Sequence, residues 1–145
     1  MASLNISIKN PTINFVWEHN TLIFTCIDQK QSLQSIEFSE YLSVITSINS
    51  GLISGKTEIQ IACAYACVLA AKSFVDFNNS DYCSKLLRAC LDIELIDKGN
   101  LSKIIKRMLA AGDVADGPVN GNHSVIEKMA LEADCIQKEI SISSR

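Results

Sequence analysis

The chain has 145 residues, of which 48% are hydrophobic and 20% are charged. This composition excludes an intrinsically disordered protein and is sufficient for one domain with its own core. The formal net charge of −3 disfavours general binding to nucleic acids or anionic membranes and favours a basic partner. The first residues carry no charged segment followed by an apolar one, so no signal peptide is expected and the cytoplasm is the predicted location.

The first thirty residues have the alternating pattern of β-strands. Ile13, Phe15 and Trp17 alternate with polar residues, and a segment rich in β-branched and aromatic residues follows at 22–27. Period-two patterning with a short polar break predicts a β-hairpin. Asn20 suits the turn because asparagine tolerates left-handed backbone angles. A similar alternation at 4–8 indicates a third strand, so residues 1–30 are assigned to a β-rich element.

From residue 35 onward the pattern has a helical period. The first helix places Phe38, Tyr41 and Ile45 on one face. The next helix, predicted over residues 57–77, is apolar on every face and contains an uninterrupted apolar segment at 61–71. Such a helix has to be enclosed, and this segment is too short for a bilayer, which needs about 20 residues. We therefore expect a buried central helix and no membrane span.

Three further amphipathic helices are predicted at about 81–96, from residue 101 to a stop at Gly112, and from residue 124. Expected helix starts are a capping box at Thr57–Gln60, a cap within Asn78–Ser80, a second capping box at Ser124–Glu127, and Asn100 as an N-cap after Gly99. The apolar face of the 81–96 helix is predicted to consist of Cys83, Leu86, Leu87, Cys90 and Leu91.

The predicted fold is mostly α, of the α+β class, in a single domain over residues 1–145. An N-terminal β-hairpin precedes a helical bundle at 35–142, in which about five helices pack around the central helix at 57–77.

The six cysteines do not indicate a disulfide framework. Most of them, such as Cys63 and Cys67, lie within helical patterns, whereas disulfide scaffolds place cysteines in the loops of small secreted chains. Zinc sites usually place closely spaced cysteines on turns. We interpret these residues as reduced thiols that pack as small apolar side chains, and we expect neither a metal nor a cofactor.

The strongest candidate site is an acidic neighbourhood along the glycine-rich loop and the last helix. Charge of this kind steers the association of oppositely charged proteins. We therefore predict a small, non-enzymatic, cytosolic protein-binding module. A bacterial immunity protein or antitoxin, which inhibits a basic toxin or effector by covering it, is the expected type. The predicted partner-binding residues are Asp113, Asp116, Glu127, Glu132 and Asp134.

Two other functions remain open at this point. Lys103, Lys106 and Arg107 form a basic face on a helix that follows a short glycine turn, which resembles a helix-turn-helix in outline. A small enzyme could also assemble a site around His19 or His123. In addition, an exposed strand edge in the β-rich element would permit a homodimer.

Overall fold

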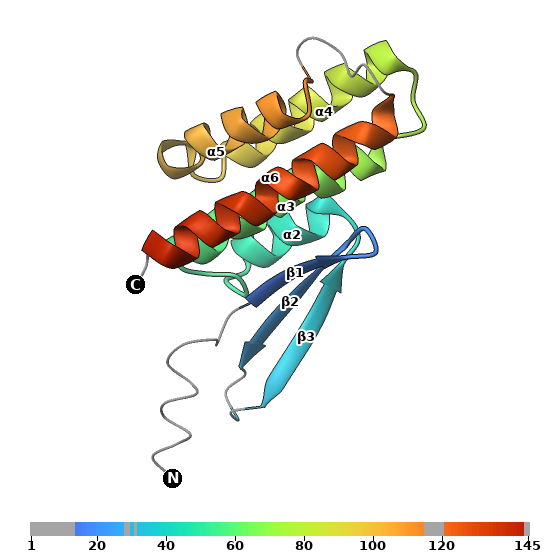
Figure 1. The fold of residues 1–145 in the computed structure, drawn as a ribbon. Coiled ribbons are helices and arrows are strands. Elements are labelled where there is room, and N and C mark those ends of the chain that lie inside the picture. Colours follow the sequence, from blue (N-terminus) through green and yellow to red (C-terminus); the bar gives the residue numbers. More distant parts are fainter. Residues whose placement is uncertain (1–13, 28–29, 31, 115–120, 144–145) are drawn as a thin grey trace. The chain divides into compact units, whose positions relative to one another are not determined.

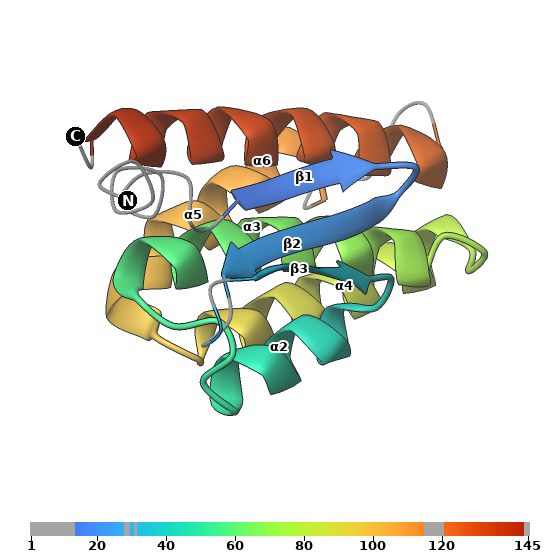
Figure 2. The same ribbon diagram turned by 90° about the horizontal axis from the view of Figure 1, so that it is seen from below.

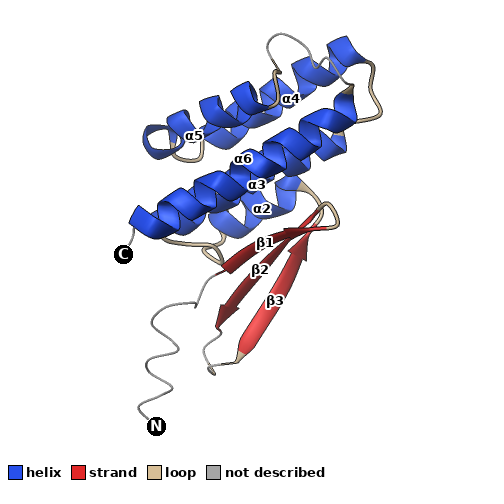
Figure 3. Ribbon diagram, in the orientation of Figure 1, coloured by secondary structure: helices blue, strands red, loops and turns tan. Residues whose placement is uncertain are grey.

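The computed structural model of the chain describes residues 14–27, 30, 32–114 and 121–143. In these residues a three-stranded antiparallel sheet precedes five helices (Figures 1 and 3). The predicted fold class, α+β and mostly helical, is confirmed. The chain divides into two compact units, Met1–Ser39 and Glu40–Arg145, which are described in turn.

The N-terminal unit is a sheet in which the strands follow one another in the order β1-β2-β3. β1 spans Asn14–Glu18, β2 spans Thr21–Ile27 and β3 spans Leu33–Phe38. His19 and Asn20, both with positive φ (54° and 59°), form the turn between β1 and β2. Positive φ at both turn residues is typical of a two-residue hairpin, and here the predicted role of Asn20 is confirmed.

The third strand is not the one that the sequence indicated. The predicted strand at 4–8 lies outside the described residues. The prediction of helix from residue 35 is wrong, because residues 33–38 pair with β2, where Leu22 lies opposite Phe38 and Phe24 lies opposite Ile36. The apolar spacing that continues from Phe38 into the next helix mimics one helical face, but the cross-strand pairs decide the local structure.

The helical unit contains α2 (Tyr41–Asn49), α3 (Lys56–Ser73), α4 (Asn79–Glu94), α5 (Lys98–Ala111) and α6 (Asn122–Ser143). α3 packs against each of the other four helices, and its longest neighbour is α6 (Figures 1 and 2). The predicted central helix is therefore present, although it ends at Ser73 rather than at residue 77.

α3 is buried along eleven consecutive residues, Ile61–Ala71. The side chains of Cys63, Tyr65 and Cys67 have no exposed surface. Alanine and cysteine predominate in this segment, and small side chains let several neighbouring helices approach one axis closely. Among the described residues no helix combines the length and the hydropathy that a membrane span requires.

Only one of the predicted side-chain caps forms. Asn78 caps α4, because its Oδ1 accepts a hydrogen bond from the backbone N–H of Asp81 at 2.9 Å. The predicted capping box of α3 is wrong: α3 begins at Lys56 after Gly55, and the Gln60 side chain instead donates to the backbone oxygen of Asn100 (3.1 Å).

The other two predicted starts are also wrong. Gly99 and Asn100 lie inside α5, which begins at Lys98. α6 begins at Asn122, two residues before the expected cap Ser124. The Ser124 hydroxyl lies in the first turn and donates to the backbone oxygen of Gly121 at 2.8 Å.

Candidate functional site

The structure distributes the predicted acidic residues over two sides of α6 rather than over one surface. Glu127 and Asp134 are seven residues apart and share a helix face, whereas Glu132 points toward α5. Asp113 follows α5, and its Oδ2 lies 3.5 Å from Nζ of Lys128. The fifth predicted residue, Asp116, lies outside the described residues.

Glu132 belongs to an ion-pair network that joins α5 to α6. Arg107 Nε donates to Glu132 Oε2 at 2.7 Å, and its two Nη atoms donate to the Glu139 carboxylate at 2.7 and 2.9 Å. This fork geometry is the strongest form of an arginine–carboxylate contact. The hydrogen bond from Arg107 holds the pKa of Glu139 below its ordinary value. Both carboxylates are therefore used within the chain.

Asp134 accepts a hydrogen bond from the Tyr65 hydroxyl. The same hydroxyl accepts a hydrogen bond from Nε2 of Gln137 at 2.9 Å, so two residues of α6 hold the polar end of a buried α3 side chain. Burial, together with the bond to Asp134, raises the pKa of Tyr65. This contact was not predicted from the sequence, although a single tyrosine in an aliphatic helix is a signal that its hydroxyl needs a partner.

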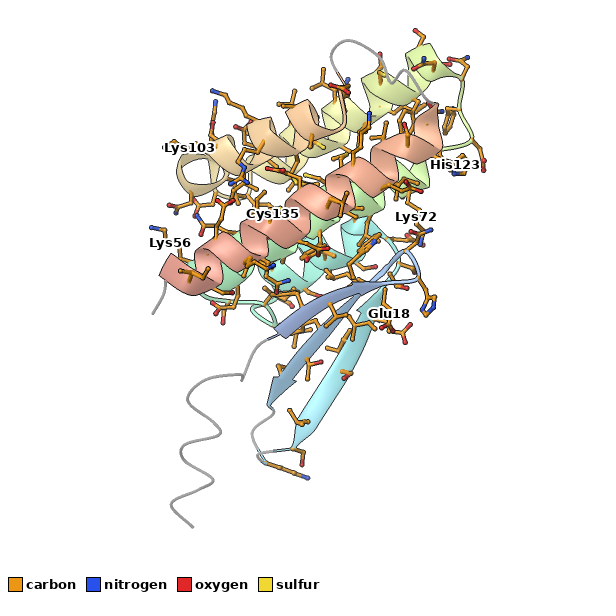
Figure 4. The ribbon with its side chains drawn as sticks, viewed as in Figure 1. Glu18, Lys56, Lys72, Lys103, His123 and Cys135 are labelled. Atoms are coloured by element: carbon orange, nitrogen blue, oxygen red, sulfur yellow. The ribbon has the colours of Figure 1, made fainter. Side chains whose placement is uncertain are left out.

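The basic face predicted for DNA binding is only partly available. Arg107 is engaged by the two glutamates of α6. Lys103 and Lys106 are exposed on α5, and neither forms an ion pair with any residue that the structure describes (Lys103 is labelled in Figure 4).

The buried cysteines are poor candidates for chemistry. Burial raises the pKa of Cys63 to about 12, and a hydrogen bond with Cys90, together with burial, raises the pKa of Cys67. A thiol that stays protonated is a weak nucleophile and a weak metal ligand. Within the described parts of the chain, no cluster of three or more His, Cys, Asp and Glu side chains could hold a metal ion.

The two histidines occupy exposed positions in different units. His19 lies in the β1–β2 turn with its Nδ1 3.9 Å from Glu18 Oε1. His123 lies in the first turn of α6, where it is labelled in Figure 4. An enzymatic role for either residue therefore stays a prediction.

α4 carries a second apolar face that the sequence analysis placed in the core. Its buried face includes Leu86 and Cys90, as predicted. The side chains of Leu87 and Leu91 are instead 41% and 45% exposed, and Leu95, directly after the helix, is 70% exposed. These three leucines are four residues apart, so they form one continuous stripe on the outer side of α4.

Comparisons with known proteins show what kind of fold this is. No protein-family profile matches the chain, and no curated protein matches it in sequence. The solved structure of translation initiation factor eIF-2B, subunit delta, from A. fulgidus is similar, with a TM-score of 0.68 and 23% sequence identity. The match covers 88% of this chain but 37% of that chain. At this level of identity the likeness concerns the fold.

Proposed function

We propose that this protein is a non-enzymatic protein-binding module. The observation that carries the proposal is the stripe formed by Leu87, Leu91 and Leu95. Single exposed leucines are common on soluble proteins, but an ordered row on one helix is typical of a surface that another protein covers. Covering three half-exposed leucines contributes on the order of 3 kcal/mol to an association.

The likeness in fold does not decide the function. The similar structure is one subunit of a translation initiation factor, and the matched region is about a third of it. A fold that occurs within a subunit is compatible with a role in a protein assembly. A shared fold does not transfer an activity, so the function of that factor is not assigned to this chain.

Inhibition of a basic partner, as in a bacterial immunity protein or antitoxin, is a narrower form of this proposal. It depends on the acidic residues near α6. Glu127 is exposed and remains available for a partner, whereas Asp113, Glu132 and Asp134 already have partners within the chain. The acidic surface is therefore smaller than the sequence predicts, which favours the leucine stripe as the main binding surface.

The proposal is tested by affinity capture from the native host with the full chain as bait. Three baits are compared: the natural sequence, Leu91→Gln on α4 and Glu127→Lys on α6. Leu131→Gln is the matched control, because this α6 leucine is 67% exposed and lies outside the stripe. We expect a specific protein that the natural chain and the control retain and that one of the two other baits loses. If the natural chain retains no protein above background, the proposal is wrong.

Binding of duplex DNA is the second candidate. Lys103 and Lys106 favour it, because both are exposed, neither has an ion-pair partner in the described part of the chain, and cations on one helix face can contact phosphates. The engagement of Arg107 by glutamates reduces this surface. A gel shift at low salt that disappears in Lys103→Glu would support DNA binding, and the absence of any shift would remove it.

A further inference from the structure

We propose that the outer side of α4 and α5 is a docking surface for an acidic amphipathic helix of a partner protein. The inference rests on the proposed protein-binding function and specifies the surface and the chemistry of the partner. Two properties of the surface carry it: the row of leucines on α4, and a set of unpaired cations beside that row.

The leucines have the geometry that recognises a helix. Steps of four residues place Leu87, Leu91 and Leu95 about 6 Å apart along the axis, so the stripe is about 12 Å long. Such a row forms a ridge that fits between corresponding side chains of a second helix. Recognition of an amphipathic helix by apolar contacts at this spacing is a common binding mode.

Four exposed cations either flank this row in the sequence or lie on α5, the helix that packs against α4. Arg88 is next to Leu87 on α4, Lys98 follows Leu95 at the start of α5, and a connection of three residues turns the chain back so that α5 packs against α4. Arg88, Lys98, Lys103 and Lys106 are all exposed, and none is within ion-pair distance of a described acid.

The acidic side chains of this segment do not neutralise the surface. Apart from Arg107, which is paired with two glutamates of α6, residues 79–111 contain five basic and four acidic side chains, so their net charge is +1, whereas the whole chain has a net charge of −3. Asp81 interacts with the cap residue Asn78, and Asp97 accepts a hydrogen bond from Asn100 at 2.7 Å. Burial and the negative charge of Asp92 raise the pKa of Tyr41 in α2. A basic surface on an acidic protein favours an acidic partner.

A second copy of the chain fits this surface less well. In a two-fold dimer the same patch would face itself, so the four cations would approach the four cations of the other copy. Nucleic acid would match the cations but would place phosphates against the three leucines. An acidic amphipathic helix satisfies both properties at once.

The test uses two synthetic helical peptides of about 20 residues with the same leucine spacing. One peptide has glutamates beside the leucines and the other has lysines. Binding to the full chain is measured by fluorescence anisotropy at about 50 mM and about 300 mM salt. We expect the glutamate peptide to bind at least about tenfold more tightly than the lysine peptide, with an affinity that falls at the higher salt.

Variants locate the binding surface. Leu91→Gln should lower the affinity for the glutamate peptide by about tenfold or more, and so should the double substitution Lys103→Glu/Lys106→Glu. Leu131→Gln and Lys138→Glu, which change exposed residues of α6, are the matched controls and should bind as the natural chain does. Circular dichroism and thermal melting verify that every variant is folded, as expected for exposed positions.

Several results would overturn the inference. The inference is wrong if both peptides bind with equal affinity or if neither binds. It is also wrong if the α6 control substitutions lower the affinity for the glutamate peptide as much as the α4 and α5 substitutions do. A concentration-dependent dimer that Leu91→Gln dissociates would assign the surface to a second copy, and duplex DNA bound through Lys103 and Lys106 would assign it to nucleic acid. If a captured host protein is lost only with Glu127→Lys, the docking surface is wrong while the proposed protein-binding function stands.

Discussion

Replacement of Leu69 by alanine tests whether α3 is the enclosed core of the helical unit. Leu69 has no exposed surface, so the substitution removes three fully buried carbon atoms. At about 0.8 kcal/mol for each buried methylene-sized group, the transfer contribution is about 2.4 kcal/mol. The cavity that remains raises the loss in the free energy of unfolding to about 3–4 kcal/mol, since the surrounding helices can only partly relax.

The same substitution at Leu131 is the matched control, because that residue is 67% exposed on α6 and its loss should change the free energy of unfolding by less than about 0.5 kcal/mol. Urea denaturation followed by circular dichroism at the helix band measures both variants. The corresponding decrease in melting temperature for Leu69→Ala is on the order of 10 °C. If the two variants lose equal stability, Leu69 is not enclosed and the described packing around α3 is wrong.

Three further outcomes follow from local features. Gly55→Ala should lower the free energy of unfolding by about 1–2 kcal/mol, because Gly55 has a φ of +94° and a Cβ there would meet the Glu58 carboxylate. Gly99→Ala in α5 should instead raise the free energy of unfolding by up to about 1 kcal/mol, and chemical denaturation compares the two variants. Arg107→Ala should lower the free energy of unfolding by less than about 1 kcal/mol through loss of the Arg107–Glu132 pair. In 1 M salt, where the screening length is about 3 Å, the melting temperatures of the variant and the natural chain should become nearly equal. Because folding raises the pKa of Cys63 to about 12, the folded state keeps a proton that the unfolded state releases above pH 9. The free energy of unfolding should therefore fall by up to about 1.4 kcal/mol per pH unit between pH 9 and pH 12. A melting temperature that stays constant or rises over this range, or labelling of Cys63 by a maleimide in the native protein as fast as that of the exposed Cys135, would contradict the described burial.

The sequence was sufficient to predict the features that depend on local pattern over a long segment. The apolar run around Tyr65 required enclosure, and α3 is enclosed by four helices. The alternation at Phe15 and Trp17, with Asn20 following, predicted the hairpin and its turn. In each case one physical requirement, burial or backbone conformation, determines the structure without information from distant residues.

The predictions that were wrong concern features that depend on long-range contacts. Leu33–Phe38 becomes a strand because β2 offers backbone partners, which no property of the segment alone reveals. Gln60 does not form a cap because the backbone oxygen of Asn100, forty residues away, accepts its hydrogen bond. Local signals compete with such contacts and lose when the distant partner is better placed.

The candidate site was less predictable than the fold. Charge counting identified Glu132 and Arg107 as parts of two separate surfaces, one acidic and one basic, yet they bind each other. Periodicity assigned Leu87 and Leu91 to the core because it cannot tell which of two adjacent apolar stripes faces inward. Only the packing of α4 on α3 and α5 decides that question.

The enclosure of α3 also limits how this protein can change. Most helices have an outer side on which replacements accumulate with little effect, but Ile61–Ala71 has no such side. A saturation scan of the chain should therefore give an unbroken band of intolerance at these eleven positions, while α4 should show tolerance at regular intervals. Any bulkier residue that enters α3 would require simultaneous changes in two or more of the surrounding helices, so divergence in this protein is directed to its periphery.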